Sequence, residues 1–120
     1  MRYLSLTLCT LFFANTCIGR NLRHPAPKEK KYIAIVKSIP EIRKEIDFYR
    51  QYAKAPLIVF VDHKEGHTYY VNVSEDLGDM LRRRYTFLVN AYTKKAHLWA
   101  VGEDKVISLT TWRKHHYKDY

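Results

Sequence analysis

Two histidines flank a glycine in the middle of the chain and are the first residues whose chemistry has to be considered. His63 and His67 lie on either side of Gly66, and Asp62 and Glu65 add carboxylates to the same segment. A tight hairpin would bring the imidazoles together, and imidazole with carboxylate is a common ligand set for divalent metals. Two ligands do not complete a site, and polar residues beside a turn are usually solvated. The pattern therefore favours a solvated turn over a metal site.

A second acidic segment follows, in which Glu75, Asp76 and Asp79 surround Gly78. Carboxylates bind calcium, but this segment lacks the 12-residue ligand rhythm of an EF-hand, so a charged turn is the favoured interpretation. Asp62, Glu75 or Asp79 acting with a histidine would support an alternative function, a small hydrolase of the cell envelope. The sequence contains neither a G-x-S-x-G nor an H-E-x-x-H motif. We therefore predict no catalytic residues, no metal site and no cofactor.

Basic side chains form the third chemical feature, and their densest group is Arg82-Arg83-Arg84. Arginine beside exposed aromatic rings can hold a polyanion and stack against its planar groups. Strand alternation places Tyr70 and Leu88 on a polar sheet face near these arginines, and neighbouring strand residues point to opposite faces, so at most two of the arginines share that face. The predicted binding residues are Arg82, Arg83, Arg84, Tyr70 and Leu88. The alternative is that these charges serve only solubility.

The N-terminal segment differs from the rest of the chain in charge and hydropathy. Residues 3–14 are an apolar run without a charge, and Cys17 and Gly19 follow as small residues. The run is shorter than the roughly 20 apolar residues that span a bilayer. We therefore predict that residues 1–19 are a signal peptide and that the mature chain begins at Arg20, in a secreted or periplasmic protein. The alternative is a lipoprotein anchored through Cys17.

Cleavage at this point changes both the cysteine content and the charge. Both cysteines, Cys9 and Cys17, would be removed, so the mature domain would fold without a disulfide, for which about 100 residues are sufficient. The net charge of +9 would fall to +8, because the segment contains one arginine and no acid. A basic secreted domain favours an anionic macromolecule or another envelope protein as its partner.

The first part of the mature chain is predicted to be helical after a linker. Residues 20–31 contain two prolines and many charges, which is typical of a flexible basic linker. Residues 32–36 are apolar and too short for periodicity to decide between strand and helix, and we favour a helix. Ser38 and Glu41 fit a capping box, which predicts a helix beginning near Ile39 and ending before Pro56. One stripe of this helix is apolar; its members are Ile42, Ile46, Tyr49 and Ala53.

The remainder of the chain has the alternation and β-branched content of strands. Residues 57–61 are a continuous apolar run, which predicts a central strand covered on both faces. Residues 69–74 and 85–90 alternate, and further strands are expected at 97–101 and 106–109. The residues expected to form the core face are Tyr69, Val71, Val73, Phe87 and Val89. Trp112 should close the core in a short turn begun by Ser108 or Thr110.

Short turns without crossover helices predict an α+β fold. In this fold the N-terminal helical region packs on one face of a four- to five-stranded antiparallel meander sheet. A single domain is expected over residues 32–114, and residues 115–120 are expected to be a frayed tail.

The segment YTFLVNAYTKKAHLWAVGEDKVISLTTWRK, residues 85–114, combines an F-x-V-N strand, a T-K turn, a D-K-x-I-S-L strand and a terminal W-R-K. It resembles small secreted bacterial domains of unassigned function, and its hairpin part is similar to PepSY-like periplasmic modules. The acidic segment departs from the G-E-D-N-G-D type of those domains at Leu77. The resemblance implies an extracytoplasmic α+β domain without supplying an active site. The sequence thus favours a non-catalytic binding or inhibitory module of the cell envelope.

Overall fold

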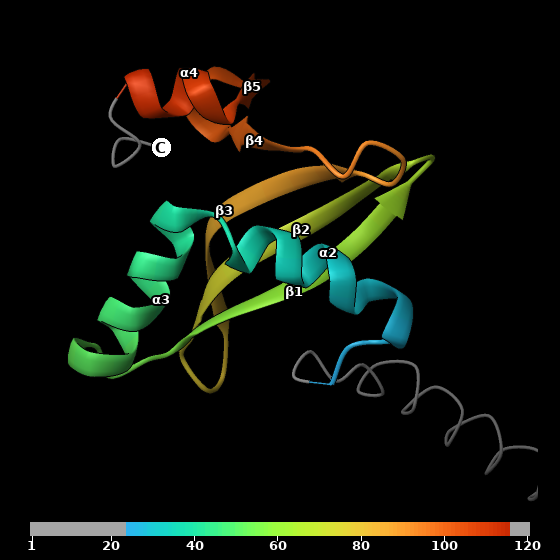
Figure 1. Cartoon of the computed structure of the whole chain (residues 1–120). Helices are drawn as coiled ribbons and strands as arrows, with labels where there is room; N and C mark the ends of the chain where they lie inside the picture. The colour runs from blue at the N-terminus through green and yellow to red at the C-terminus, as the bar shows by residue number, and fades with distance from the viewer. Residues whose placement is uncertain (1–23, 116–120) are drawn as a thin grey trace, which may run out of the picture.

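The computed structural model describes residues 24–115, which form an antiparallel sheet of five strands and three α-helices (Figure 1). In chain order the elements are η1 (Pro27–Glu29), α2 (Lys30–Lys37), α3 (Pro40–Tyr52), β1 (Leu57–Glu65), β2 (Thr68–Asp76), β3 (Leu81–Asn90), β4 (Ala96–Ala100), η2 (Val101–Glu103), β5 (Lys105–Ser108) and α4 (Leu109–Lys114). None of the helices in this range is long and apolar enough to cross a membrane. The predicted signal peptide and residues 116–120 lie outside the described residues.

The strands follow one another across the sheet in the order β1-β2-β3-β4-β5, and every neighbouring pair is antiparallel. This confirms the predicted α+β class and the antiparallel meander. Helical structure is not confined to the N-terminal part, because α4 follows the last strand. The prediction of a central strand at residues 57–61 is wrong, since β1 lies at the edge of the sheet. An apolar run indicates that side chains are buried, as Val59, Phe60 and Val61 are, and does not indicate how many strands lie alongside.

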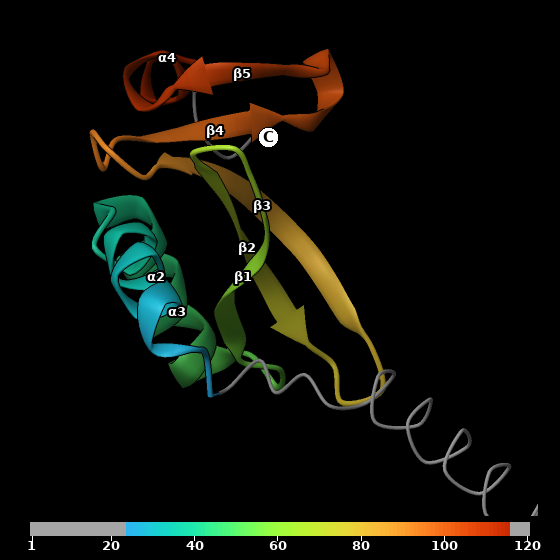
Figure 2. The ribbon, with the colours of Figure 1, turned by 90° about the vertical axis from the view of Figure 1, so that its right-hand side faces the viewer.

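The first helices begin earlier than expected. Residues 27–31, which were predicted to belong to the linker, form η1 and the first turn of α2. The helical interpretation of residues 32–36 is confirmed. The Tyr32 ring stacks on the Tyr69 ring of β2 with their centroids 3.8 Å apart, and Ile33 and Val36 are also buried. Figure 2 shows α2 and α3 on the same side of β1, β2 and β3.

The helix α3 begins at Pro40, close to the predicted start near Ile39, but not through a capping box. Its N-cap residue is Ile39, in an extended conformation and without a side-chain hydrogen bond to the helix. The Ser38 hydroxyl instead donates to the carbonyl of Ile35 at 2.7 Å, which satisfies an acceptor at the C-terminal end of α2. The predicted apolar stripe is present in part, because Ile42 is fully buried and Ile46 packs against the core.

The core closes at the C-terminal end through Trp112, as the sequence predicted. Its side chain is fully buried and makes edge contacts with the rings of Tyr85 and Phe87, at centroid distances of 5.6 and 5.8 Å. Ser108 begins α4 as its N-cap residue, and its hydroxyl accepts the Thr111 N–H at 3.0 Å. This short helix therefore brings a large aromatic side chain onto β3.

Candidate binding face

The sheet has two faces of different composition. The inner face carries the buried residues Tyr69, Val71, Val73, Phe87 and Val89, which are the residues that alternation predicted for the core. The outer face carries the intervening residues of β2 and β3 and their neighbours on β4, among them Tyr70, Asn72, Thr86, Leu88 and Trp99. This outer face holds two hollows lined by polar and aromatic side chains.

A β-bulge decides which arginine reaches the outer face. In the pairing of β2 with β3, Val73 lies opposite Tyr85 and Ser74 lies opposite Arg83, so that Arg84 has no counterpart in β2. Plain alternation counted back from Thr86 would have placed Arg84 and Arg82 on the outer face. The extra residue reverses this order, and Arg83 lines the outer hollow instead.

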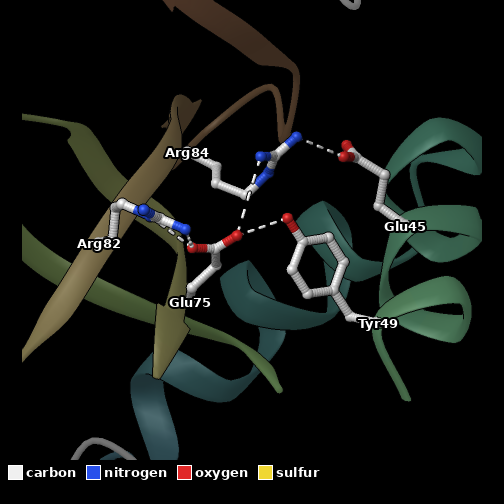
Figure 3. A network of polar contacts seen from close by, with 5 residues as sticks. All are labelled: Glu45, Tyr49, Glu75, Arg82 and Arg84. Atoms are coloured by element: carbon white, nitrogen blue, oxygen red, sulfur yellow. Dashed lines mark hydrogen bonds and ion pairs between the residues drawn. The ribbon is translucent and has the colours of Figure 1, made fainter. Parts of the chain in front are cut away.

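Arg82 and Arg84 lie on the inner side, where they belong to a polar network with α3 (Figure 3). Arg82 donates to Glu75 at 2.5 Å, and Arg84 donates to Glu45 of α3 at 2.9 Å. The Tyr49 hydroxyl donates to the other oxygen of Glu75 at 2.6 Å. The network joins α3 to the ends of β2 and β3 and occupies two of the three arginines.

The pKa values of the network residues follow from these contacts. The hydrogen bond from Tyr49 lowers the pKa of Glu75, with help from Arg82, although burial acts in the opposite direction. Burial and the bond to Glu75 raise the pKa of the Tyr49 hydroxyl. Burial and the neighbouring Glu45 carboxylate raise the pKa of Tyr85. Near neutral pH, Glu75 is therefore an anion held between the neutral phenol of Tyr49 and the guanidinium groups of Arg82 and Arg84, an arrangement that serves the fold.

The first hollow of the outer face has a volume of about 240 Å³ and contains Arg83. Its other lining residues are Asp62, His63, Tyr70, Asn72, Thr86 and Trp99. Asn72 and Thr86 are buried, and the Thr86 hydroxyl donates to the Asn72 carbonyl oxygen at 2.8 Å. Arg83 forms no ion pair with an acidic side chain among residues 24–115. A free guanidinium beside two aromatic rings can bind an anionic group.

The histidine of this hollow is fixed by its neighbours. Nδ1 of His63 lies 2.6 Å from an Asp62 oxygen, Nε2 lies 3.4 Å from a Glu65 oxygen, and the ring stacks on Tyr70 at 4.3 Å. Since both ring nitrogens face carboxylates, neither is presented to the hollow as a general base. The Thr86 hydroxyl is already bonded to Asn72, so the residues lining this hollow include no activated nucleophile.

The structure does not bring together the histidines and carboxylates that the sequence analysis considered, and disfavoured, as metal ligands. His67 lies beside Tyr92, with ring centroids 4.5 Å apart, and not beside His63. Glu75 and Asp76 belong to β2 and not to a loop, and an Asp76 oxygen accepts the Gly78 N–H at 3.0 Å. Within residues 24–115 no group of three or more histidine, cysteine or acidic side chains is arranged to hold a metal ion.

The second hollow has a volume of about 300 Å³ and adjoins Leu88. It is lined by Thr68, Leu88, Asn90, Thr93, Lys95, His97 and Val106. Of the five predicted binding residues, Arg83, Tyr70 and Leu88 therefore share the outer face, whereas Arg82 and Arg84 do not. Sequence reasoning missed Trp99 and Lys95. Alternation within β4, where Leu98 and Ala100 are buried, is the signal that would have placed Trp99 on the outer face.

No protein-family model, curated protein or solved structure was found to match this chain. The resemblance of residues 85–114 to PepSY-like modules therefore stays a prediction.

Proposed function

We propose that this domain is a non-catalytic binding module of the cell envelope that holds an anionic partner on the outer face of its sheet. The observation that carries the proposal is Arg83, which lines an aromatic hollow without an acidic partner among the described residues. In this proposal α2 and α3 cover the inner face, and the outer face is left to the partner. The partner is an anionic macromolecule or an acidic surface of another envelope protein.

The chemistry of the outer face supports binding more than hydrolysis. A hydrolase would need a base with a free nitrogen or a carboxylate beside a nucleophile, but His63 is enclosed between Asp62 and Glu65. Arginine, tyrosine and tryptophan are the residues enriched at the energetic centres of binding surfaces. Arg83, Tyr70 and Trp99 line the same hollow.

The proposal includes a location outside the cytoplasm. Its support is the apolar run at residues 3–14 followed by Cys17 and Gly19, in a part of the chain outside the described residues. A lipoprotein anchored through Cys17 would carry the same binding face at a membrane surface.

Elution from immobilised heparin at increasing salt tests the binding face. Arg83→Gln removes the outer-face cation, and Arg43→Gln is the matched control, because it removes one exposed positive charge from α3. We expect Arg83→Gln to elute at clearly lower salt than Arg43→Gln. In the proposal Arg83 contacts heparin directly, whereas Arg43 contributes only to the net charge, whose attraction for heparin is screened by salt. Equal shifts would show that only net charge matters, and the proposal would then fail.

A further inference from the structure

The two hollows of the outer face lie end to end along the strands. The first contains Tyr70, Thr86 and Trp99, and the second contains Leu88 and His97. Tyr70 lies opposite Leu88, and Leu88 lies opposite His97, so these three form a single row across the sheet where the hollows meet. A linear ligand lying along β3 and β4 would therefore contact both hollows.

Each hollow has one cation, and the two cations are far apart. Arg83 lies opposite Ser74 at one end of β2. At the other end Thr68 lies opposite Asn90, whose N–H donates to the Lys95 carbonyl at 3.0 Å. The six steps between the seven residues from Thr68 to Ser74 span about 20 Å of backbone at roughly 3.4 Å per residue. Lys95, like Arg83, forms no ion pair with an acidic group in the described part of the chain.

Rings and neutral hydrogen-bonding groups occupy the space between the cations. Tyr70 and Trp99 present aromatic surface, and Asn72, Thr86 and Asn90 line the hollows. The Thr86 hydroxyl donates to Asn72 and the Asn90 side-chain oxygen accepts two backbone N–H groups, so the two amide NH2 groups are the donors left for a ligand. A sugar ring matches this combination, because its C–H face packs on the negative face of an aromatic ring and its hydroxyls reach amide groups.

The wide spacing of the cations argues against a nucleic acid. A strand of duplex DNA carries one phosphate per about 3.4 Å, so a 20 Å path would bring several phosphates to two cations. Asp62 lines the first hollow, and its carboxylate would repel a densely charged ligand more strongly than a ligand with few charges. A polysaccharide with a carboxylate on every second sugar carries far fewer charges over the same length.

We propose that the outer face binds a linear polysaccharide that contains uronic acid residues. Arg83 and Lys95 each bind one carboxylate of the same chain, and Tyr70 and Trp99 pack against the sugar rings between them. This inference rests on the proposed function, since it names the anionic partner of the same face.

Intrinsic fluorescence gives a direct test, because Trp99 lines the first hollow and Trp112 is fully buried. The probe is a hexasaccharide of alternating glucuronate and N-acetylglucosamine, and the comparison probes are the neutral N-acetylglucosamine hexamer and decathymidylate. We expect the uronate hexasaccharide to change the Trp99 emission and to bind most tightly. Arg83→Gln and Lys95→Gln should each weaken binding about tenfold, the factor that corresponds to the loss of one charged hydrogen bond near 1.4 kcal/mol. Arg43→Gln should leave the affinity unchanged.

The outcomes separate this inference from the proposed function. Tighter binding of decathymidylate, with loss in Arg83→Gln, would overturn the polysaccharide and leave an anion-binding face. Equal affinity for the neutral hexamer would also overturn it, because the two cations would then contribute nothing. Failure of every probe, together with equal heparin elution of Arg83→Gln and Arg43→Gln, would overturn both. An unchanged circular dichroism spectrum in each variant verifies that the fold is intact.

Discussion

Replacing Tyr49 by phenylalanine tests whether α3 is held to the sheet through Glu75. The Tyr49 hydroxyl donates to a Glu75 side chain that is only 7% exposed, at 2.6 Å. A hydrogen bond to a charged group contributes about 1.5–3 kcal/mol. Because Arg82 still binds the carboxylate in the variant, we expect Tyr49→Phe to lower the free energy of unfolding by about 1.5 kcal/mol, the lower end of that range.

A double-mutant cycle with Glu75→Gln isolates the contribution of the pair. Glutamine keeps the shape and a neutral acceptor but removes the charge, so this variant should lose about 2 kcal/mol. The Arg82 side chain is 65% exposed and is rehydrated when its ion pair with Glu75 is lost, which limits the contribution of that ion pair to the free energy of unfolding. We expect a coupling of about 1 kcal/mol between the two substitutions, measured by urea unfolding with circular dichroism and Trp112 fluorescence. Additivity within about 0.5 kcal/mol would refute the shared contribution.

The coupling should also depend on pH. The contacts of Glu75 lower its pKa in the folded protein below the value in the unfolded chain, which is about 4.3. The stabilisation is therefore fully present above about pH 5 and is lost as the pH falls through the folded-state pKa. Repeating the cycle near pH 3 should give a smaller coupling than near pH 7. The same coupling at both pH values would show that the carboxylate charge is not its source.

Further predictions concern the effect of two serine substitutions on stability, the effect of a chelator on the melting temperature, and the N-terminus of the mature chain. Ser108→Ala should lower the free energy of unfolding by about 1 kcal/mol, because Ser108 caps α4, and the exposed Ser38→Ala should lower it less; equal losses in urea unfolding would contradict the capping role. EDTA should leave the melting temperature unchanged, and a fall would reveal a structural metal. The intact mass of the exported protein should correspond to a chain beginning at Arg20, whereas a lipid on Cys17 would contradict the signal-peptide prediction.

Periodicity predicted the parts of the fold that depend on which side chains are buried. Alternation in residues 69–74 and 85–90 assigned the inner and outer faces of β2 and β3 correctly. Trp112 was predicted to close the core because an apolar aromatic residue followed a serine that can begin a short helix. In both cases the pattern follows directly from the burial of apolar side chains away from water, so a single sequence was sufficient to predict it.

The errors concern features that burial does not determine. Val59, Phe60 and Val61 of the run at residues 57–61 are buried, yet β1 is an edge strand, because hydropathy does not report strand order. Ser38 had the spacing of a capping box, but its hydroxyl bonds to the preceding helix, which competes for the same side chain. The candidate site was predicted in part: Arg83, Tyr70 and Leu88 lie on the outer face, whereas the bulge places Arg84 beside Glu45 of α3 and Arg82 beside Glu75 of β2 on the inner side.

The bulge at Arg84 has an evolutionary consequence. Removing this one residue would leave Val73 opposite Tyr85 and Ser74 opposite Arg83. The β3 residues before and after this position would therefore stay on the faces of the sheet that they occupy now. Chain length can therefore vary by one residue here without exchanging the faces of the sheet. In relatives of this chain, a single-residue gap at this position would mark the loss of the ion pair with Glu45 on α3, while the outer face would keep its arginine.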